Sequence, residues 1–300
     1  MTSLIYLIKR DIKLFFRDKG MFFTALITPL ILLMLYCTFL GNVYRDAFES
    51  VLTEYGITIE KKLLDALVGG QLFSSLLAVS TVTVSFCANM LMVQDKANGA
   101  AKDISITPVK SSHTALAYYI ATTLSALIIS LVATLSCVIY LSVVGWYMSW
   151  SDVLFILLDV FIMVGFGTAL SSVINFFLST QGQISAVGSI VSSCYGFICG
   201  AYMPLSQLSE GFRKVLSFLP GTYGTALFRK HAMSGAFTEL ENTGVPSAII
   251  DGLKESVDFD VIFFGEKVPV YAMYTYLALT VIIILGAYVL LNVFKRKETK

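Results

Sequence analysis

The sequence predicts an all-α integral membrane protein with six transmembrane helices per protomer. Of its 300 residues, 56% are hydrophobic and only 14% are charged, whereas soluble domains contain about 25% charged residues. The mean hydropathy is +0.78. A chain of this composition cannot bury its apolar surface in one water-soluble core, so the lipid bilayer is its expected environment. The net charge of +1 gives no reason to expect nucleic acid as a partner.

Long apolar segments that can each cross a bilayer alternate with polar ones. The six predicted spans are residues 21–40, 71–93, 114–144, 152–178, 183–203 and 271–294. Pro29 lies inside the first span, where a kink is tolerable because neighbouring helices can satisfy the freed carbonyl. The second span is rich in Ser, Thr and Ala, which suit close contact between helices. Both Trp residues, Trp146 and Trp150, precede the fourth span as expected interfacial anchors.

The first 20 residues are too charged to cross a bilayer and are expected to form an interfacial helix on the cytoplasmic side. Apolar side chains share one face of this helix. The opposite face carries Lys9, Arg10, Lys13 and Arg17, whose side chains can reach lipid headgroups. The alternative is a cytosolic segment that touches nothing in particular.

The distribution of Lys and Arg predicts that both termini are cytoplasmic. With that orientation, the inner segments hold 12 Lys and Arg against 5 Asp and Glu, and they are residues 1–20, 94–113, 179–182 and 295–300. The outer segments hold 9 against 13, and they are residues 41–70, 145–151 and 204–270. We therefore expect a multi-pass protein of the plasma membrane.

Two polar segments stand out between the spans. Residues 94–113 form a cytoplasmic loop, expected to be a short helix from Asp95 to Ser105 that ends before Pro108. In the outer segment 41–70, apolar residues recur at helical spacing from Leu52 to Leu67, which predicts an amphipathic helix on the outer face.

The chain divides into four parts, the third of which is the least regular. They are the interfacial helix (1–20), spans one to five (21–203), an outer segment (204–270) and the sixth span with its tail (271–300). Residues 257–264 alternate partly like a strand, and we expect residues 234–270 to form a small extracellular subdomain. A loop without fixed structure is the alternative.

The sequence contains no catalytic or metal-binding pattern. Its two His and five Cys residues have no metal-ligand spacing, and no GxSxG elbow is present. A GxxxxGK[ST] phosphate loop is also missing, so the chain is not expected to bind ATP or to be an enzyme. Asp159, in the fourth span, is either a functional site or a carboxylate bonded to a neighbouring helix or water. For Asn89, in the second span, packing is favoured over substrate contact.

Two groups of residues lie at matching topological positions, one after the second span and one after the fifth. The first group is Asp95, Gly99 and Thr107-Pro108, and the second is Gly200, Pro204-Leu205, Leu219-Pro220, Tyr223 and Arg229. Together with the basic first helix, they resemble the permease subunit of an ABC-2 type (type V) ATP-binding-cassette exporter. The loop departs from the family pattern at Ala97-Asn98, Ala101 and Ser105.

The resemblance implies a division of labour between chains. A separate ATPase subunit would hold ATP and Mg and would grip the N-terminal helix and a coupling helix, at Asp95, Gly99, Ile104, Thr107 and Pro108. A second permease, identical or paralogous, would complete a path near spans one, two and five. Re-entrant half-helices would close the path outside, with an extracellular gate at Gly200, Pro204, Leu219, Pro220 and Tyr223.

The aromatic content of 13% and the nearly uncharged spans favour an amphiphilic cargo, such as a drug, hydrophobic peptide or lipid-like molecule. Glycan export by a permease of the same family is an alternative. An ATP-independent immunity or sensor protein, or a secondary transporter that uses Asp159 for protons, are alternatives from other classes.

Overall fold

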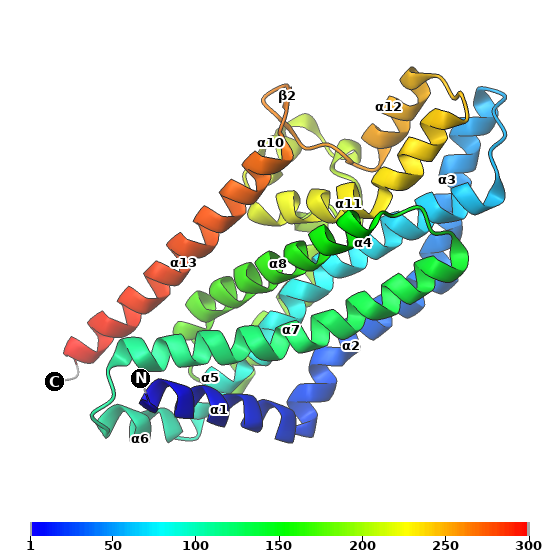
Figure 1. Ribbon diagram of the computed structural model, residues 1–300. Coiled ribbons are helices and arrows are strands. Elements are labelled where there is room, and N and C mark those ends of the chain that lie inside the picture. Colours follow the sequence, from blue (N-terminus) through cyan, green and yellow to red (C-terminus); the bar gives the residue numbers. More distant parts are fainter. Residues whose placement is uncertain (1, 299–300) are drawn as a thin grey trace.

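The protein is an elongated bundle of long helices, with the two termini at the same end (Figure 1). The computed structural model describes residues 2–298. The first half of the chain contains α1 (Thr2–Arg17), α2 (Lys19–Leu35), η1 (Tyr36–Leu40), α3 (Gly41–Glu54), α4 (Lys61–Ala88), α5 (Met90–Ala97), α6 (Ala100–Ile106) and α7 (Ser111–Val144). Helices α1 and α6 lie at the same end as the termini (Figure 1).

The second half adds two more long helices and the elements at the opposite end of the bundle. These elements are α8 (Trp150–Phe176), α9 (Gln181–Ile198), η2 (Leu205–Gln207), α10 (Glu210–Leu216), α11 (Pro220–Asn242), α12 (Ser247–Ser256), β1 (Ile262–Phe263), β2 (Glu266–Lys267) and α13 (Val270–Glu298). The strands β1 and β2 form one antiparallel hairpin. Helices α3 and α12 and the hairpin lie away from the termini (Figure 1).

Five of the described helical segments are long and apolar enough to cross a membrane: residues 19–54, 61–97, 111–144, 150–176 and 270–295. They correspond to predicted spans one, two, three, four and six. The predicted fifth span corresponds to α9, which has 18 residues and several Ser and Gly. A bilayer-spanning helix needs about 20 residues, so a sixth crossing stays a prediction.

Helix α4 is the centre of the bundle, and 94% of its most apolar stretch is buried. It packs on α2, α7, α8, α9 and α11. Small residues allow the close approach that the Ser- and Ala-rich sequence predicts. A Cβ added at Gly70 would lie 2.7 Å from Met233 Cγ of α11, and one at Gly167 of α8 would lie 2.9 Å from Val82 Cα.

The outer segment 41–70 differs from the expected single amphipathic helix. Helix α3 continues the first span through the π-helical turn η1 and ends at Glu54. The chain then turns at Gly56, whose φ of +67° favours glycine. Helix α4 begins at Lys61, ten residues before the predicted start of the second span at Gln71. Leu63 and Leu67 therefore belong to α4, whereas Leu52 belongs to α3. Their regular spacing in the sequence does not reflect one helix, because the chain turns between Glu54 and Lys61.

The outer segment 204–270 is largely helical. Helix α11 is a continuous helix of 23 residues that begins at Pro220 and is mostly buried. The expected strand at residues 257–264 is confirmed only for Ile262–Phe263. Asp258 has a φ of +48° and its carboxylate accepts the backbone N–H groups of Leu205 and Ser206, so it cannot continue a strand.

The contact of α11 with the loop between α7 and α8 gives a stability test. A Cβ at Gly235 would fall directly onto the carbonyl oxygen of Tyr147, whereas one at Gly252 in α12 meets nothing within 4 Å. Gly235→Ala is expected to destabilise the protein by about 1–3 kcal/mol through overpacking. Gly252→Ala is expected to be neutral or to stabilise by about 0.5–1 kcal/mol. Thermal unfolding in detergent measures both, and equal melting temperatures would contradict the contact.

Candidate functional site

The cytoplasmic loop forms two helical pieces, not the expected single helix over residues 95–105. Helix α5 continues the second span to Ala97, and α6 covers Ala100–Ile106. Gly99 separates them with a left-handed φ of +85°, a conformation that L side chains rarely adopt. The break allows α6 to turn away from the bundle axis (Figure 1). Asp95 and Gly99, expected on one coupling helix, therefore lie on the end of the span and in the turn between α5 and α6.

Asp95 joins the cytoplasmic loop to the N-terminal helix. Its carboxylate is buried and accepts two hydrogen bonds from the Arg10 guanidinium, at 2.7 and 2.9 Å. The Tyr118 hydroxyl of α7 donates a third, at 2.6 Å. A bidentate Arg–carboxylate pair fixes both side chains in one geometry. Helices α1, α5 and α7 are thus tied together at one carboxylate, which we name the Asp95 junction.

Arg10 differs from the other basic residues of α1. Lys9, Lys13 and Arg17 are exposed, as the predicted basic face requires, whereas Arg10 turns inward. Its hydrogen bonds to Asp95 raise the pKa of Arg10 above its usual value. Burial raises the pKa of the neighbouring Asp11 to about 6, although Arg10 acts in the opposite direction. Arg10 is therefore a structural ion-pair residue and not free to meet lipid headgroups.

Lys96 fixes the same loop to the fourth span. Its ammonium donates to the backbone carbonyls of Asn175, Phe176 and Leu178, at 2.8, 2.7 and 3.0 Å. These carbonyls lie at the C-terminal end of α8, where helical C=O groups lack intrahelical partners and a cation is favoured. The three N–H donors of the lysine match three acceptors.

Helix α6 and the residues that follow it are largely exposed. Ile106 is 85% exposed, an unusual position for a large apolar side chain. Ile104 is partly buried, and Thr107 and Pro108 are exposed. The Thr107 hydroxyl donates to the Ile104 carbonyl at 2.6 Å and closes the last turn. The surface of α6 is thus available to a partner, while Asp95 behind it is not.

Asn89 lies at the junction of α4 and α5 and is completely buried. Its amide donates to the hydroxyls of Ser171 and Ser172 on α8, at 2.8 and 3.0 Å. The side chain of Asn175 donates back to the Asn89 carbonyl at 3.2 Å. Buried amides in a membrane protein are stabilised by such bonds between helices. The structure thus places Asn89 in a packing network between the second and fourth spans.

Asp159 lies in a second buried polar group near the other end of the bundle. Its carboxylate is 2.7 Å from Nδ1 of His231 on α11 and accepts the Tyr274 hydroxyl of α13 at 2.6 Å. Phe155 stacks on the His231 ring with centroids 5.0 Å apart. Three helices therefore meet at one carboxylate, as they do at the Asp95 junction.

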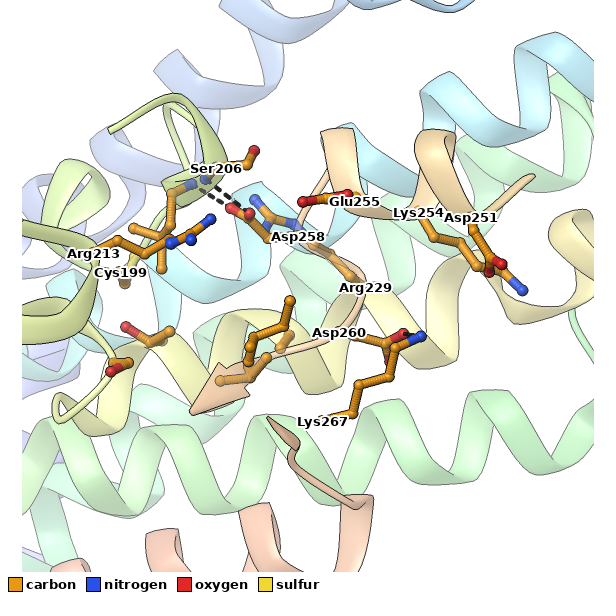
Figure 2. Close-up of a pocket in the computed structure, with 16 residues that line it drawn as sticks. Cys199, Ser206, Arg213, Arg229, Asp251, Lys254, Glu255, Asp258, Asp260 and Lys267 are labelled. Atoms are coloured by element: carbon orange, nitrogen blue, oxygen red, sulfur yellow. Dashed lines mark hydrogen bonds and ion pairs between the residues drawn. The ribbon is translucent and has the colours of Figure 1, made fainter. Parts of the chain in front are cut away.

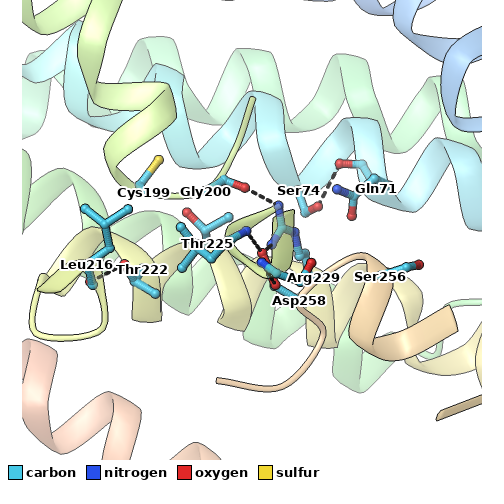
Figure 3. A network of polar contacts seen from close by, with 12 residues as sticks. Gln71, Ser74, Cys199, Gly200, Leu216, Thr222, Thr225, Arg229, Ser256 and Asp258 are labelled. Carbon is cyan, nitrogen blue, oxygen red and sulfur yellow. Dashed lines mark hydrogen bonds and ion pairs between the residues drawn. The ribbon is translucent and has the colours of Figure 1, made fainter. Parts of the chain in front are cut away.

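Arg229 lies between Gly200, at the end of α9, and Asp258 (Figure 3). Arg229 is only 2% exposed, and it donates to the carbonyl of Gly200 and lies 3.6 Å from the Asp258 carboxylate. Gly200 has a φ of +73°, which ends α9 and directs its carbonyl to Arg229. Burial raises the pKa of Asp258, although Arg229 and the backbone donors of Leu205 and Ser206 oppose it. We call this the Arg229 clamp.

The other expected gate residues define the turns next to the clamp. Pro204 precedes the short helix η2, and Leu219 and Pro220 start α11, with Pro220 in the first helical position. Tyr223 donates from its hydroxyl to the Ser217 carbonyl at 2.7 Å. These residues lie at the ends of helices, where backbone N–H and C=O groups lack partners within the helix. A side-chain hydroxyl can supply such a partner, and a proline at the first helical position has no N–H that needs one.

A cavity of about 330 Å³ lies beside the clamp (Figure 2). Its charged lining residues are Arg213, Arg229, Lys254, Lys267, Asp251, Glu255, Asp258 and Asp260. Positive and negative groups balance, and some already pair, such as Lys267 with Asp260 at 3.0 Å. The cavity therefore has no net charge with which to select an ion.

A larger groove lies between α2 and α9. It has a volume of about 540 Å³ and is lined by Thr24, Ile27, Thr28, Ile31, Leu32, Cys87, Met90, Ser185, Gly188, Ser189, Ser192, Ser193 and Tyr202. Most of α9 is exposed, with Ile184, Tyr195 and Gly196 buried. Small and hydroxylated residues suit a neighbouring helix better than lipid.

The sequence contains no direct sign that His231, Tyr274 or Asp258 are partners of the predicted residues. The one signal is that His231 belongs to the outer segment 204–270 and Asp159 lies near the start of the fourth span, next to the outer segment 145–151. The buried bonds of Arg10 and Lys96 have no signal beyond their positive charge. Contacts between residues about 80 positions apart do not follow from a helical period.

The Asp95 junction gives a test of whether α1 and α5 are energetically coupled. Asp95→Asn is expected to lower stability by about 2 kcal/mol, less than for a fully buried ion pair because Arg10 is partly exposed. Arg10→Gln should lower stability by a similar amount. The double variant should be only slightly less stable than either single variant. Thermal unfolding in detergent at pH 8, where Asp11 with its pKa of about 6 is ionised, measures the cycle. Additive losses would show that the pair carries no coupling.

The Asp159 group gives a test between a structural and a proton-transfer role. Asp159→Asn should lower the melting temperature, because an amide offers one oxygen acceptor where the carboxylate offers one each to His231 and Tyr274, and a hydrogen bond contributes about 0.5–1.5 kcal/mol. Transport by the folded variant should keep the wild-type pH profile. A changed profile in a variant that remains folded would overturn the structural role.

One family comparison matches most of the chain. The family described as ABC-2 type transporter matches residues 2–232. No curated protein sequence matches the chain. The matched region includes the N-terminal helix, the cytoplasmic loop and the first part of the outer segment. The chain belongs to the ABC-2 type transporter family and is a multi-pass membrane permease subunit of an ABC-type transporter.

Proposed function

We propose that this permease exports an amphiphilic cargo, such as a drug, a hydrophobic peptide or a lipid-like molecule, with energy from a separate ATPase subunit. The ATPase holds ATP and Mg, since this chain carries no phosphate-binding loop in its sequence. The family normally works with an ATPase subunit. With both termini in the cytoplasm, α1 and α6 face this partner.

The Asp95 junction is the observation that carries the proposal. A partner that moves α6 also moves α5, and the Arg10–Asp95 pair transmits this motion to α1. The three carbonyl bonds of Lys96 extend the connection to α8. The cytoplasmic end therefore moves as one body, and rigid elements transmit displacement better than loose loops.

A second permease is proposed to pack on the groove between α2 and α9. This face combines exposed large apolar residues of α2, Ile27 and Ile31, with the Ser and Gly face of α9. A copy of the chain placed here would enclose a path lined by apolar and hydroxyl groups. Such a lining suits an amphiphilic cargo and offers no fixed charge to an ion. The Arg229 clamp lies at the outer end of this path.

Purification in mild detergent tests the proposal directly. When the permease is purified from the cells that naturally express it, we expect a soluble ATPase of about 200–300 residues to co-purify. Ile106→Glu should reduce the recovered ATPase, because it places a charge in the exposed apolar surface of α6. Tyr55→Glu is a matched control, since Tyr55 is 61% exposed at the opposite end of the bundle.

The outcome is read from ATPase recovery and ATP-dependent transport in proteoliposomes. Reduced recovery for Ile106→Glu alone supports the cytoplasmic docking surface. If no ATPase is recovered with the wild-type permease, or if both variants lose it equally, the proposed coupling is wrong.

A further inference from the structure

We propose that an aromatic patch at the end of the bundle opposite the termini inserts into the adjacent membrane leaflet. The patch consists of the exposed side chains of Phe218, Ile262 and Phe264, from the turn before α11 and from the hairpin. Its occupant is lipid, at the boundary of headgroups and acyl chains. The inference requires only that the chain spans a membrane and is independent of the cargo and of the ATPase.

The patch is apolar and exposed. Phe264 is 70% exposed, Phe218 52% and Ile262 42%. The rings of Phe218, Phe263 and Phe264 lie in edge-on contact, with centroids between 4.8 and 6.0 Å apart. Exposed apolar patches of this kind mark interaction surfaces, and aromatic residues are enriched at membrane interfaces.

The hairpin holds Phe264 outward at an unfavourable backbone position. Phe263 pairs with Glu266, so Phe264 and Gly265 form a two-residue turn with φ values of +49° and +91°. A turn with both central φ values positive strongly favours Asn, Asp or Gly. Phenylalanine at the first position therefore does not serve the turn. Strained backbone is typical of residues retained for a contact outside the fold.

The position of the patch identifies lipid as the occupant. Hairpin and α10 lie at the start of the spanning helix α13 (Figure 1), and the Tyr276 hydroxyl of α13 donates to the Phe218 carbonyl at 2.5 Å. Only 11% of the apolar stretch of α13 is buried, and Leu279, Ile282 and Ile283 are exposed along it. The patch thus continues the lipid-facing surface of α13 toward the polar region.

Charges on α10 complete an interfacial arrangement. Glu210 and Lys214 of α10 pair at 2.7 Å, and both line a cavity beside Ile262 and Phe264 of the hairpin. Apolar side chains toward the acyl region and charged ones toward the headgroups are typical of an element that lies in the interface plane. Helix α13 packs on α7, α8 and α11, whereas the groove proposed for a second permease lies between α2 and α9.

Tryptophan fluorescence of the full-length permease in liposomes tests the inference. The two natural tryptophans are removed as Trp146→Phe and Trp150→Phe, and Phe264→Trp then provides a single reporter. We expect a blue-shifted emission and a loss of emission in liposomes made with brominated phosphatidylcholine. Aqueous iodide should quench it weakly. Asn242→Trp, at the exposed C-terminal end of α11, is the control and should show the reverse pattern.

Phe218→Trp provides a second reporter within the patch, because it leaves the hairpin turn unchanged. It should also be quenched by brominated lipid. Strong iodide quenching and no bromolipid quenching at both positions would overturn the inference. Protection from both quenchers would also overturn it, because the patch would then be covered by protein, such as a second copy of the chain.

Discussion

The burial of α4 on every side is the constraint on which the rest of the structure depends. A helix that contacts α2, α7, α8, α9 and α11 has no room for large side chains at each contact. Gly70 and Gly167 allow backbones to approach there. Lipid offers no driving force between helices, so packing and hydrogen bonds have to hold this centre together. The positions of the neighbouring helices therefore depend on the small residues at their contacts with α4, which let the backbones approach closely.

Polar contacts between helices are concentrated near the two ends of the bundle. At the end with the termini, Asp95 joins α1, α5 and α7. Nearer the opposite end, Asp159 joins α8, α11 and α13, and Arg229 connects the end of α9 with Asp258. An unpaired buried charge is strongly destabilising, so each group is sensitive to loss of one partner. Between these two ends, the helices are held together mainly by close packing of complementary side chains.

The helical, membrane-spanning character of the chain follows from composition and apolar length, and four predicted spans match their helices within a few residues at most ends. The sequence predicts the start of the second span ten residues too late. The charged residues Lys61, Lys62 and Asp65 make this part of α4 look too polar for a membrane span, although the helix is largely buried here by α3, α11 and the loop before α8. Motif spacing singles out Gly99 and Arg229, which the structure places in the turn before α6 and in the Arg229 clamp. It could not reveal that Asp95 is bound by Arg10, or that Asp159 meets His231, since these contacts join residues 85 and 72 positions apart.

The bonds between the second and fourth spans have a consequence for biosynthesis. Asn89 and Lys96 find their partners in residues 171–178, between 79 and 83 positions later in the chain. At a synthesis rate of about 5–20 residues per second, these residues follow after about 4–16 s. During that interval the central helix lacks the neighbour that satisfies its amide and its ammonium. Because of this order of synthesis, the polar groups of the second span are first without these hydrogen-bond partners. The fourth span supplies the partners when it is made.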